Sequence, residues 1–168
     1  MKRVLAVSEY NDPRNTRHRL HLVDADDPFR LSLLSVLETP DIVHSLRNRD
    51  GLLYCSMPKG FSIYDVSSLE AVKELSHLDL YGGISMELSS DGNYAYLTSW
   101  KRGITIVDVH NPCNPFVAGL APCNYEVLPD DKTPFGPYGV AGLSLRGNYL
   151  FCVTCDYTDD KHREVFIV

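Results

Sequence analysis

The chain lacks the apolar segments that mark membrane and exported proteins. No stretch of its 168 residues approaches the roughly 20 apolar residues that a membrane-spanning helix needs. The first residues include two basic side chains but only four consecutive apolar ones (4–7), fewer than the roughly 7 to 15 of a secretory signal. We therefore expect no membrane span and no targeting signal in this chain. By default that places it in the cytoplasm, or at the cell surface or outside the cell if it is a fragment of a longer protein.

The chain also lacks a surplus of basic residues and the common catalytic motifs. It has 16 Lys and Arg against 22 Asp and Glu, a formal charge of −6, whereas nucleic-acid binders gather Lys and Arg on one face. It contains no glycine-rich phosphate loop, no G-x-S-x-G and no H-E-x-x-H. The sequence therefore predicts no nucleic-acid partner, no catalytic residues, no cofactor and no metal. With 44% hydrophobic and 23% charged residues it is typical of a folded domain.

What the sequence does contain is a repeat. Asp24, Asp65 and Asp108 each end an apolar run (HLVDA, SIYDV, TIVDV) and precede a turn, at intervals of 41 and 43 residues. A second apolar run recurs before each of the later copies, at 51–55, 93–97 and 148–152. Repeats of about 40–45 residues with several strands each are typical of β-propeller blades.

Each complete unit predicts four antiparallel strands and no helix. The predicted strands are 42–46, 52–56, 61–66 and 71–75 in one unit and 84–88, 95–99, 104–109 and 115–120 in the next. Partial helical spacing occurs at 65–78, but its position in the repeat predicts a turn and an outer strand. The units span about 1–40, 41–81, 82–121 and 138–168, with a loop insertion at 122–137, in one domain or fragment, 1–168.

The first and last units are incomplete. The chain begins in a second strand (4–8) and stops in a third (165–168), so two blades are complete and two are not. The fold class is therefore all-β, an antiparallel β-propeller of about four blades that forms part of a larger ring. Open strands expose unpaired N–H and C=O groups, so we expect a protein partner or a second copy to complete the sheets.

The segments HLVDA, IYDV, TIVDVHNP and GNYAYLTS resemble the LVIVD repeat, and the resemblance covers nearly the whole chain. It fits best in the third unit, departs in the second where SSL replaces the Asn-Pro turn, and is interrupted in the fourth by the insertion. The resemblance implies a β-propeller and a surface or secreted setting, but it implies no specific activity.

Cysteine, histidine and aspartate are the residue types that could form a metal or redox site here. The five cysteines form no even framework; Cys55 and Cys152 occupy the repeat position of Leu97, which predicts buried core residues, and Cys113 and Cys123 stay open as a pair. His44 is predicted on an inner strand with Met86 and Ala141 as its equivalents, so no ring of metal ligands is expected. The repeated aspartates are predicted to cap turns, and a cation site at Asp156, Asp159 and Asp160 is less favoured than a solvated acidic loop.

Loop length differs between the two ends of the predicted sheets. All the long loops (9–19, 100–103, 122–137 and 156–163) fall at one end, and the other end is predicted to have only tight turns such as 50–51 and 91–92. Long loops on a rigid scaffold concentrate binding residues, with solvated loops without function as the alternative. The predicted binding residues are Arg14, Arg17, His18, Arg19, Trp100, Lys101, Arg102, Tyr125, Asp130, Lys132, Tyr157 and Lys161, together with Tyr10 and Asp131.

These features favour a non-catalytic binding or scaffold module whose long-loop face takes a protein or glycan partner. Two alternatives stay open: a fragment of a propeller enzyme whose catalytic residues lie outside this chain, and a structural protein of the cell surface.

Overall fold

A computed structural model describes residues 4–8, 18–99, 103–121, 138–156 and 165–167 of the chain. These residues form four antiparallel sheets in chain order, with three, four, four and three strands. The first sheet contains β1 (Val4–Ser8), β2 (His18–Asp24) and β3 (Ser32–Thr39). The second contains β4 (Ser45–Arg49), β5 (Leu52–Met57), β6 (Gly60–Asp65) and β7 (Lys73–Asp79). The third contains β8 (Met86–Leu88), β9 (Tyr94–Ser99), β10 (Gly103–Asp108) and β11 (Phe116–Ala121). The fourth contains β12 (Tyr138–Arg146), β13 (Tyr149–Asp156) and β14 (Val165–Ile167).

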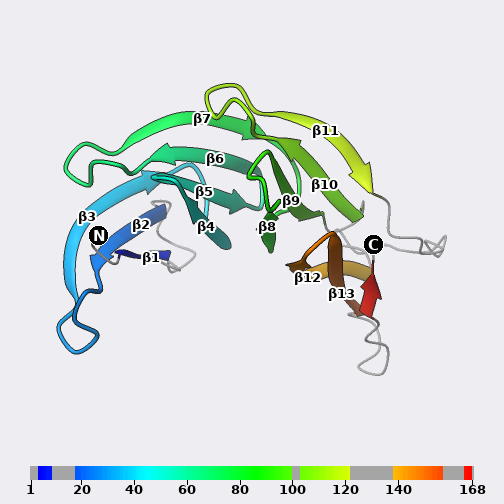
Figure 1. Cartoon of the computed structure of the whole chain (residues 1–168), viewed down its shortest axis with the longest axis horizontal. Helices are drawn as coiled ribbons and strands as arrows, with labels where there is room; N and C mark the ends of the chain where they lie inside the picture. The colour runs from blue at the N-terminus through cyan, green and yellow to red at the C-terminus, as the bar shows by residue number, and fades with distance from the viewer. Residues whose placement is uncertain (1–3, 9–17, 100–102, 122–137, 157–164, 168) are drawn as a thin grey trace.

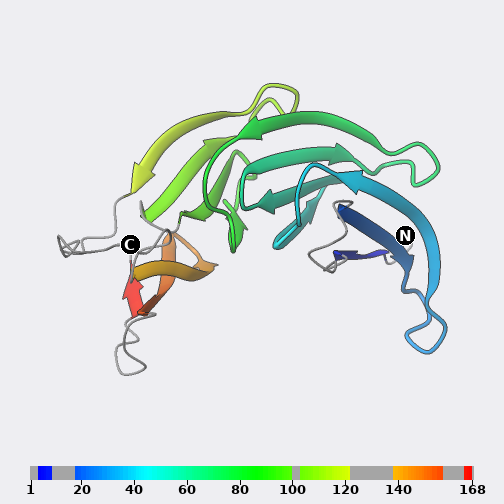
Figure 2. The same cartoon turned by 180° about the vertical axis from the view of Figure 1, so that it is seen from behind.

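The four sheets follow one another around an open arc (Figure 1, and from behind Figure 2). The strands β3, β7 and β11 lie on the convex side, and β4 and β8 lie toward the concave side (Figure 1). The inner strands are neighbours, since β4 contacts β8 and β8 contacts β12. This radial order of antiparallel sheets is that of propeller blades, and it confirms the predicted fold class.

Apolar side chains fill each junction between neighbouring sheets. Leu20 and Leu22 of the first sheet pack with Leu53 and Cys55 of the second. Phe61 and Ile63, on the second sheet, pack with Met86 and Leu97 of the third in the next junction. Ile104 packs with Leu143 and Leu150 in the last. Because side chains of a strand alternate between its two faces, each inner sheet supplies apolar residues to both neighbours.

The strand predictions hold in order and type. The segment with partial helical spacing is a turn followed by β7, as predicted, and the described residues contain no helix. The incomplete units are the three-stranded sheets β1–β3 and β12–β14. Three predicted boundaries are wrong: the inner strands predicted at 42–46 and 84–88 are β4, at Ser45–Arg49, and β8, at Met86–Leu88, and the outer strand predicted at 71–75 is β7, at Lys73–Asp79. Val43 is buried at 5% exposure as the chain enters the sheet, so its apolar character reflects packing and not strand pairing.

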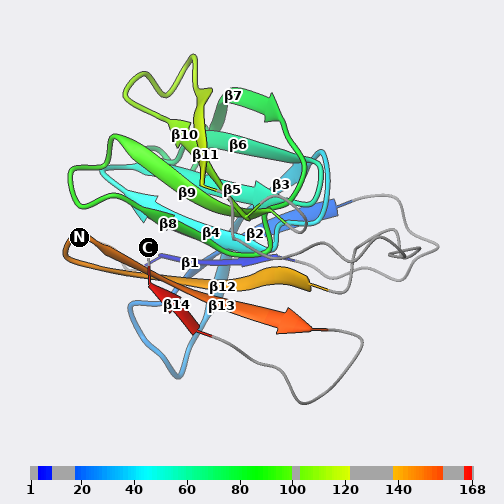
Figure 3. The ribbon, with the colours of Figure 1, turned by 90° about the vertical axis from the view of Figure 1, so that its right-hand side faces the viewer.

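The two ends of the sheets differ in their connections, and we name them the loop end and the turn end. At the loop end the chain passes from second to third strand and from sheet to sheet, as where Gly82 N–H donates to Pro58 O at 3.1 Å. At the turn end lie the first-to-second and third-to-fourth connections. Strands run between these ends in all four sheets (Figure 3).

A tight turn at 50–51 joins β4 to β5 at the turn end. Asp50 has φ 51° and Gly51 has φ 78°, which is the pair of positive φ angles of a type I′ hairpin turn, for which Asp-Gly is favoured. The described part of the chain includes no helix of the length and apolarity that would let it cross a membrane.

Candidate functional site

The structure describes only two of the predicted binding residues. His18 and Arg19, predicted as the end of a loop, are instead the first residues of β2. The others lie outside the described residues: Arg14, Arg17, Trp100, Lys101, Arg102, Tyr125, Asp130, Lys132, Tyr157 and Lys161, as well as Tyr10 and Asp131. The segments that hold them connect β1 to β2, β9 to β10, β11 to β12 and β13 to β14.

His18 belongs to the joint between the first and second sheets. Its Nε2 lies 3.8 Å from Asp41 Oδ1, and both side chains are about one-fifth exposed, at 21% and 23%. Asp41 in turn accepts a hydrogen bond from Ile42 N–H at 2.8 Å, and its carbonyl accepts one from Thr39 Oγ1 at 2.9 Å. His18 therefore lies against a fixed carboxylate that follows β3, which gives the loop end a rigid base at this joint.

His44 lies immediately before β4, and its N–H donates to Ser56 O at 2.9 Å. Desolvation by surrounding atoms lowers the pKa of His44, although the residue keeps more than a third of its surface exposed, and the Asp41 carboxylate opposes this shift. The neutral imidazole is therefore favoured here. The predicted equivalence of His44 with Met86 was wrong, because the strand pairing places Leu46, Met86 and Leu143 at the same position.

A Ser–His–Asp arrangement that was not predicted from the sequence occurs on β6 and β7. Ser62 Oγ lies 2.8 Å from His77 Nδ1, and His77 Nε2 lies 3.3 Å from Asp79 Oδ1. The imidazole lies directly over Gly60, where an added Cβ would meet His77 Cε1 at 2.5 Å. The available signal was the glycine itself, since glycine within a strand often marks a close approach of another group.

This arrangement cannot act as a nucleophilic centre in the structure. Ser62 has no exposed surface, so a substrate carbonyl has no access to its hydroxyl, and a triad requires the reacting atom within reach. Ser62 Oγ also lies 3.3 Å from Glu74 Oε1. The group is a polar network that runs from the buried Ser62 to the exposed Asp79 and ties the outer strand β7 to β6.

Tyr64, two residues after Ser62, adds a second buried polar group on the same face. Its exposure is 3%, and burial raises its pKa to about 12, with the Ser62 hydroxyl nearby opposing the shift. Ser62 Oγ is engaged by His77 and Glu74, and the Tyr64 hydroxyl has no hydrogen-bond partner among the described residues. An unpaired buried hydroxyl of this kind costs free energy.

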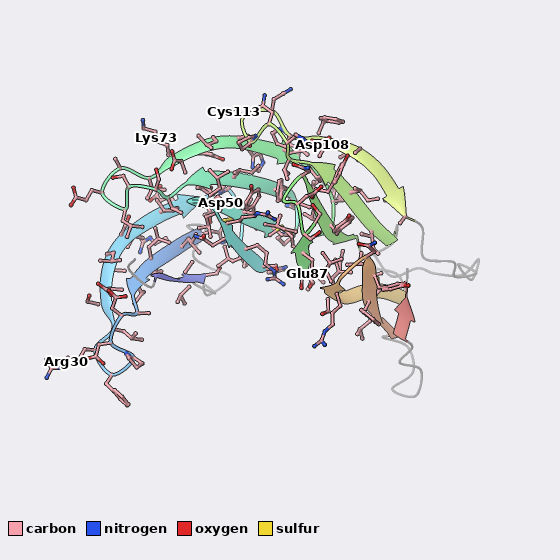
Figure 4. The ribbon with its side chains drawn as sticks, in the orientation of Figure 1. Arg30, Asp50, Lys73, Glu87, Asp108 and Cys113 are labelled. Atoms are coloured by element: carbon pink, nitrogen blue, oxygen red, sulfur yellow. The ribbon has the colours of Figure 1, made fainter. Side chains whose placement is uncertain are left out.

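The concave side of the arc carries an ion pair between neighbouring sheets. Arg47 of β4 contacts Glu87 of β8 through two nitrogens, Nε to Oε2 at 3.0 Å and NH2 to Oε1 at 2.9 Å. Arg49, two residues on, donates to the carbonyl oxygens of Ser89 at 3.0 Å and Ser90 at 2.9 Å. Figure 4 shows Glu87 toward the concave side, with Lys73 and Cys113 at the convex edge. Both arginines therefore bind the second sheet to the third.

The three repeated aspartates cap turns, as predicted. Asp24, Asp65 and Asp108 each accept a hydrogen bond at Oδ1 from the N–H two residues later, at 3.0, 2.9 and 2.9 Å. They lie at the turn end, one sheet apart from each other. No group of three or more His, Cys, Asp or Glu suited to a metal ion occurs among the described residues. Asp159 and Asp160, two of the three aspartates of the less favoured cation site, lie outside them.

The cysteines at the repeat position are core residues. Cys55 and Cys152 are both 0% exposed, which confirms the prediction for both. Burial raises the pKa of the Cys55 thiol, and the Glu74 carboxylate raises it further, so this thiol is held in its unreactive protonated form. Cys113 is exposed on the connection between β10 and β11, and Cys123 lies outside the described residues.

Comparison with known families identifies one unit of this chain. Residues 82–120 match the family model of the LVIVD repeat, and this segment coincides with the third sheet, β8–β11. The match confirms the resemblance at the unit where the sequence fits best, and LVIVD repeats form β-propellers, in agreement with the arc of sheets. No curated protein matches the chain.

Proposed function

We propose that this chain is a non-catalytic binding or scaffold module whose loop end takes a protein or glycan partner. One observation carries the proposal: the third-to-fourth connections at the turn end all have the same length, whereas connections of one kind at the loop end differ widely in length. Because the sheets are built alike, the lengths of their equivalent connections can be compared directly.

At the turn end, the third-to-fourth connections are uniform. They cover 25–31, 66–72 and 109–115, seven residues in each case, and each begins with the capped aspartate turn described above. The expectation of only tight turns at this end was therefore wrong for these connections. Their equal length follows from a shared structural role in the turn.

At the loop end, lengths vary widely for connections of the same kind. The second-to-third connections are 9–17, 58–59, 100–102 and 157–164, and the connections between sheets are 40–44, 80–85 and 122–137. Variation of this size is unnecessary for joining similar strands, and loops on a rigid scaffold are where recognition concentrates.

The side-chain types on these connections suit recognition of a partner. They include Trp100, Arg102, Tyr125 and Tyr157, and Trp, Tyr and Arg are the commonest anchors of protein interfaces. The described residues beneath them, such as His18 with Asp41 and Ser56 with Gly83, are engaged in joining sheets. The described side chains therefore hold neighbouring sheets together, and the proposed binding residues lie on the connections above them.

The test compares two double variants of the full chain. Trp100→Ala with Arg102→Ala removes an aromatic and a basic anchor at the loop end. Phe29→Ala with Arg30→Ala is the matched control, because this pair lies at the turn end and Phe29 is 94% exposed. The probes are immobilised β-glucan, chitin, mannan and peptidoglycan fragments, and capture from extracts of the source cells with identification by mass spectrometry.

We expect a partner bound by the unmodified chain to be retained by the Phe29/Arg30 variant. The Trp100/Arg102 variant should weaken binding by about tenfold or more, which corresponds to ~1.4 kcal/mol or more. Equal binding by both variants, or loss in the control alone, contradicts the assignment of the loop end.

A further inference from the structure

Among the described residues, one face of the first sheet has no neighbouring sheet, and exposed apolar side chains lie on it together with Arg19, His21 and Glu38. Leu20 and Leu22 pack toward the second sheet, so the alternation along β2 places His21 and Val23 on the opposite face. Val7 and Val36 pair with His21 across the ladder and share that face. Both valines are 43% exposed, and Leu33, opposite Val23, is 59% exposed.

The fourth sheet has the complementary uncovered face. Leu150 and Cys152 pack toward the third sheet, so Tyr149, Phe151 and Val153 lie on the other face of β13. Tyr149 is 62% exposed and Val153 is 40% exposed. Each end of the arc (Figure 1) therefore presents a sheet face with exposed apolar side chains, beside which Ser144 and Arg146 lie on the fourth sheet.

The repeat shows what such faces do elsewhere in the chain. Val7 pairs with His21, which lies three residues before the turn-capping Asp24. In the next two sheets the residues three before the capping aspartate are Ser62 and Thr105, and they pair with Cys55 and Leu97. Cys55 and Leu97 are both 0% exposed, each within the junction to the preceding sheet. The uncovered face of the first sheet is thus built as the receiving side of a sheet junction.

The same comparison applies to the fourth sheet. The ladders place Cys152 at the position of Cys55 and Leu97, so Phe151 is equivalent to Tyr54 and Tyr96. Tyr54 is 4% exposed in the junction from the second to the third sheet, and Tyr96 packs into the junction from the third to the fourth. The uncovered face of the fourth sheet is built as the donating side of a junction.

Two residues on the first sheet strengthen this comparison. The ladders make Leu33 and Val36 equivalent to Glu74 and His77 of the second sheet. At these two positions the second sheet has polar side chains at the margin of its junction. The first sheet has apolar side chains there, on a face that no other described sheet covers. Exposed apolar side chains that gather on one sheet face are typical of an interaction site.

We propose that two copies of this chain stack head to tail, the face of β12–β14 in each copy packing on the face of β1–β3 in the other. The occupant is a second copy because the chain carries both halves of one junction type, and that junction is already formed three times between its own sheets. Two such contacts close a pair of four-sheet arcs into a ring of eight sheets, within the range of about four to eight blades that propellers adopt. A head-to-tail contact makes a closed ring when its rotation closes.

This pairing is independent of the loop-end function, because it uses sheet faces and not the connections. The test is sedimentation velocity of the full chain from about 1 to 100 µM, a range that brackets typical specific self-association. We expect a species of twice the 18.9 kDa chain mass. Val36→Glu and Val153→Glu should each shift dissociation to at least about tenfold higher concentration, because each places a charge in the junction.

Two further measurements make the test specific. Phe116→Glu is the control, because Phe116 is also exposed, at 53%, but lies on β11 away from both end faces; it should leave the mass unchanged. An equimolar mixture of the Val36→Glu and Val153→Glu chains retains one intact junction, so it should recover the paired mass that neither variant shows alone. Circular dichroism checks that each variant keeps its strand content.

Several outcomes would overturn the proposal. A chain of 18.9 kDa throughout the range would do so, since it would leave both faces uncovered or to be covered by further sheets of a longer protein. Pairs that survive either glutamate substitution would show a different contact, and pairs lost in only one variant would show a like-to-like face. Open chains of more than two copies would contradict closure of the ring.

Discussion

Arg47 and Glu87 occupy adjacent inner strands one repeat apart, and the guanidinium holds the carboxylate through two contacts of 3.0 and 2.9 Å. Arg47 lies opposite Tyr54 on β5, and Glu87 lies opposite Tyr96 on β9, so the two residues hold the same position in successive sheets. The same repeat position thus supplies the cation of one sheet and the anion of the next. Such a pair joins neighbouring sheets where their inner strands approach.

Removing this ion pair should loosen the junction between the second and third sheets. Because the Arg47 side chain is 37% exposed and that of Glu87 is 22% exposed, solvent weakens the attraction, and we expect a coupling free energy of about 0.5–1 kcal/mol. Urea unfolding of Arg47→Ala, Glu87→Ala and the double variant measures it. Additive effects of the two single substitutions would show that the contact contributes nothing.

Gly60 is required by the imidazole that covers it. Gly60→Ala should displace the His77 ring and break its contact with Ser62, at a cost of about 1–2 kcal/mol in the free energy of unfolding. Gly119→Ala is the matched control, because its added Cβ meets only Ile106 Cδ1 at 3.8 Å. Adding His77→Ala to Gly60→Ala should restore part of the loss; no recovery would place the strain elsewhere.

Alkaline pH should destabilise the fold through Tyr64. Its pKa is raised from 10.0 to about 12 in the folded chain, so folding favours the neutral phenol over the ionised form. The contribution of this preference to the free energy of unfolding is complete below about pH 10. It is lost as the pH rises through about 12. The shift corresponds to roughly 2–3 kcal/mol.

Tyr64→Phe removes this ionisation and the unpaired hydroxyl together. Chemical unfolding between pH 8 and pH 12 should therefore show a shallower loss of stability in Tyr64→Phe than in the unmodified chain, and no lower stability at pH 8. Parallel pH profiles of the two proteins would contradict the assignment.

The cysteines should react at very different rates. Cys113 is exposed, whereas Cys55 is buried with a raised pKa, and only the thiolate reacts with a disulfide reagent. Modification at pH 7.5 followed by peptide mapping should label Cys113 rapidly and Cys55 at least about a hundredfold more slowly, at a rate set by opening of the fold. Equal rates would mean that the junction around Cys55 is open in solution.

The repeat made most of this fold predictable. The end of the third strand in each unit could be located from Asp24, Asp65 and Asp108. The carboxylate is needed there to cap the turn that follows the strand. The inner strands were less predictable. Val43 is apolar because it is buried just ahead of β4. Its hydrophobicity suggested a strand residue, so the predicted strand began too early and His44 was aligned with Met86.

The candidate site was less predictable than the fold. Ser62 and His77 are fifteen residues apart and meet only through the register of β6 and β7, which no local motif encodes. The residue types of Trp100 and Tyr125 and their place in long connections predict a binding surface, and this assignment stays a prediction.

The most direct test of the account is hydrogen exchange of the full chain with and without the partner captured by the unmodified protein. We predict slowed exchange in the loop-end segments 9–17, 100–102, 122–137 and 157–164, with unchanged exchange in the turn-end connections 25–31, 66–72 and 109–115. Protection confined to the turn-end connections would contradict the claim that the loop end is the binding surface.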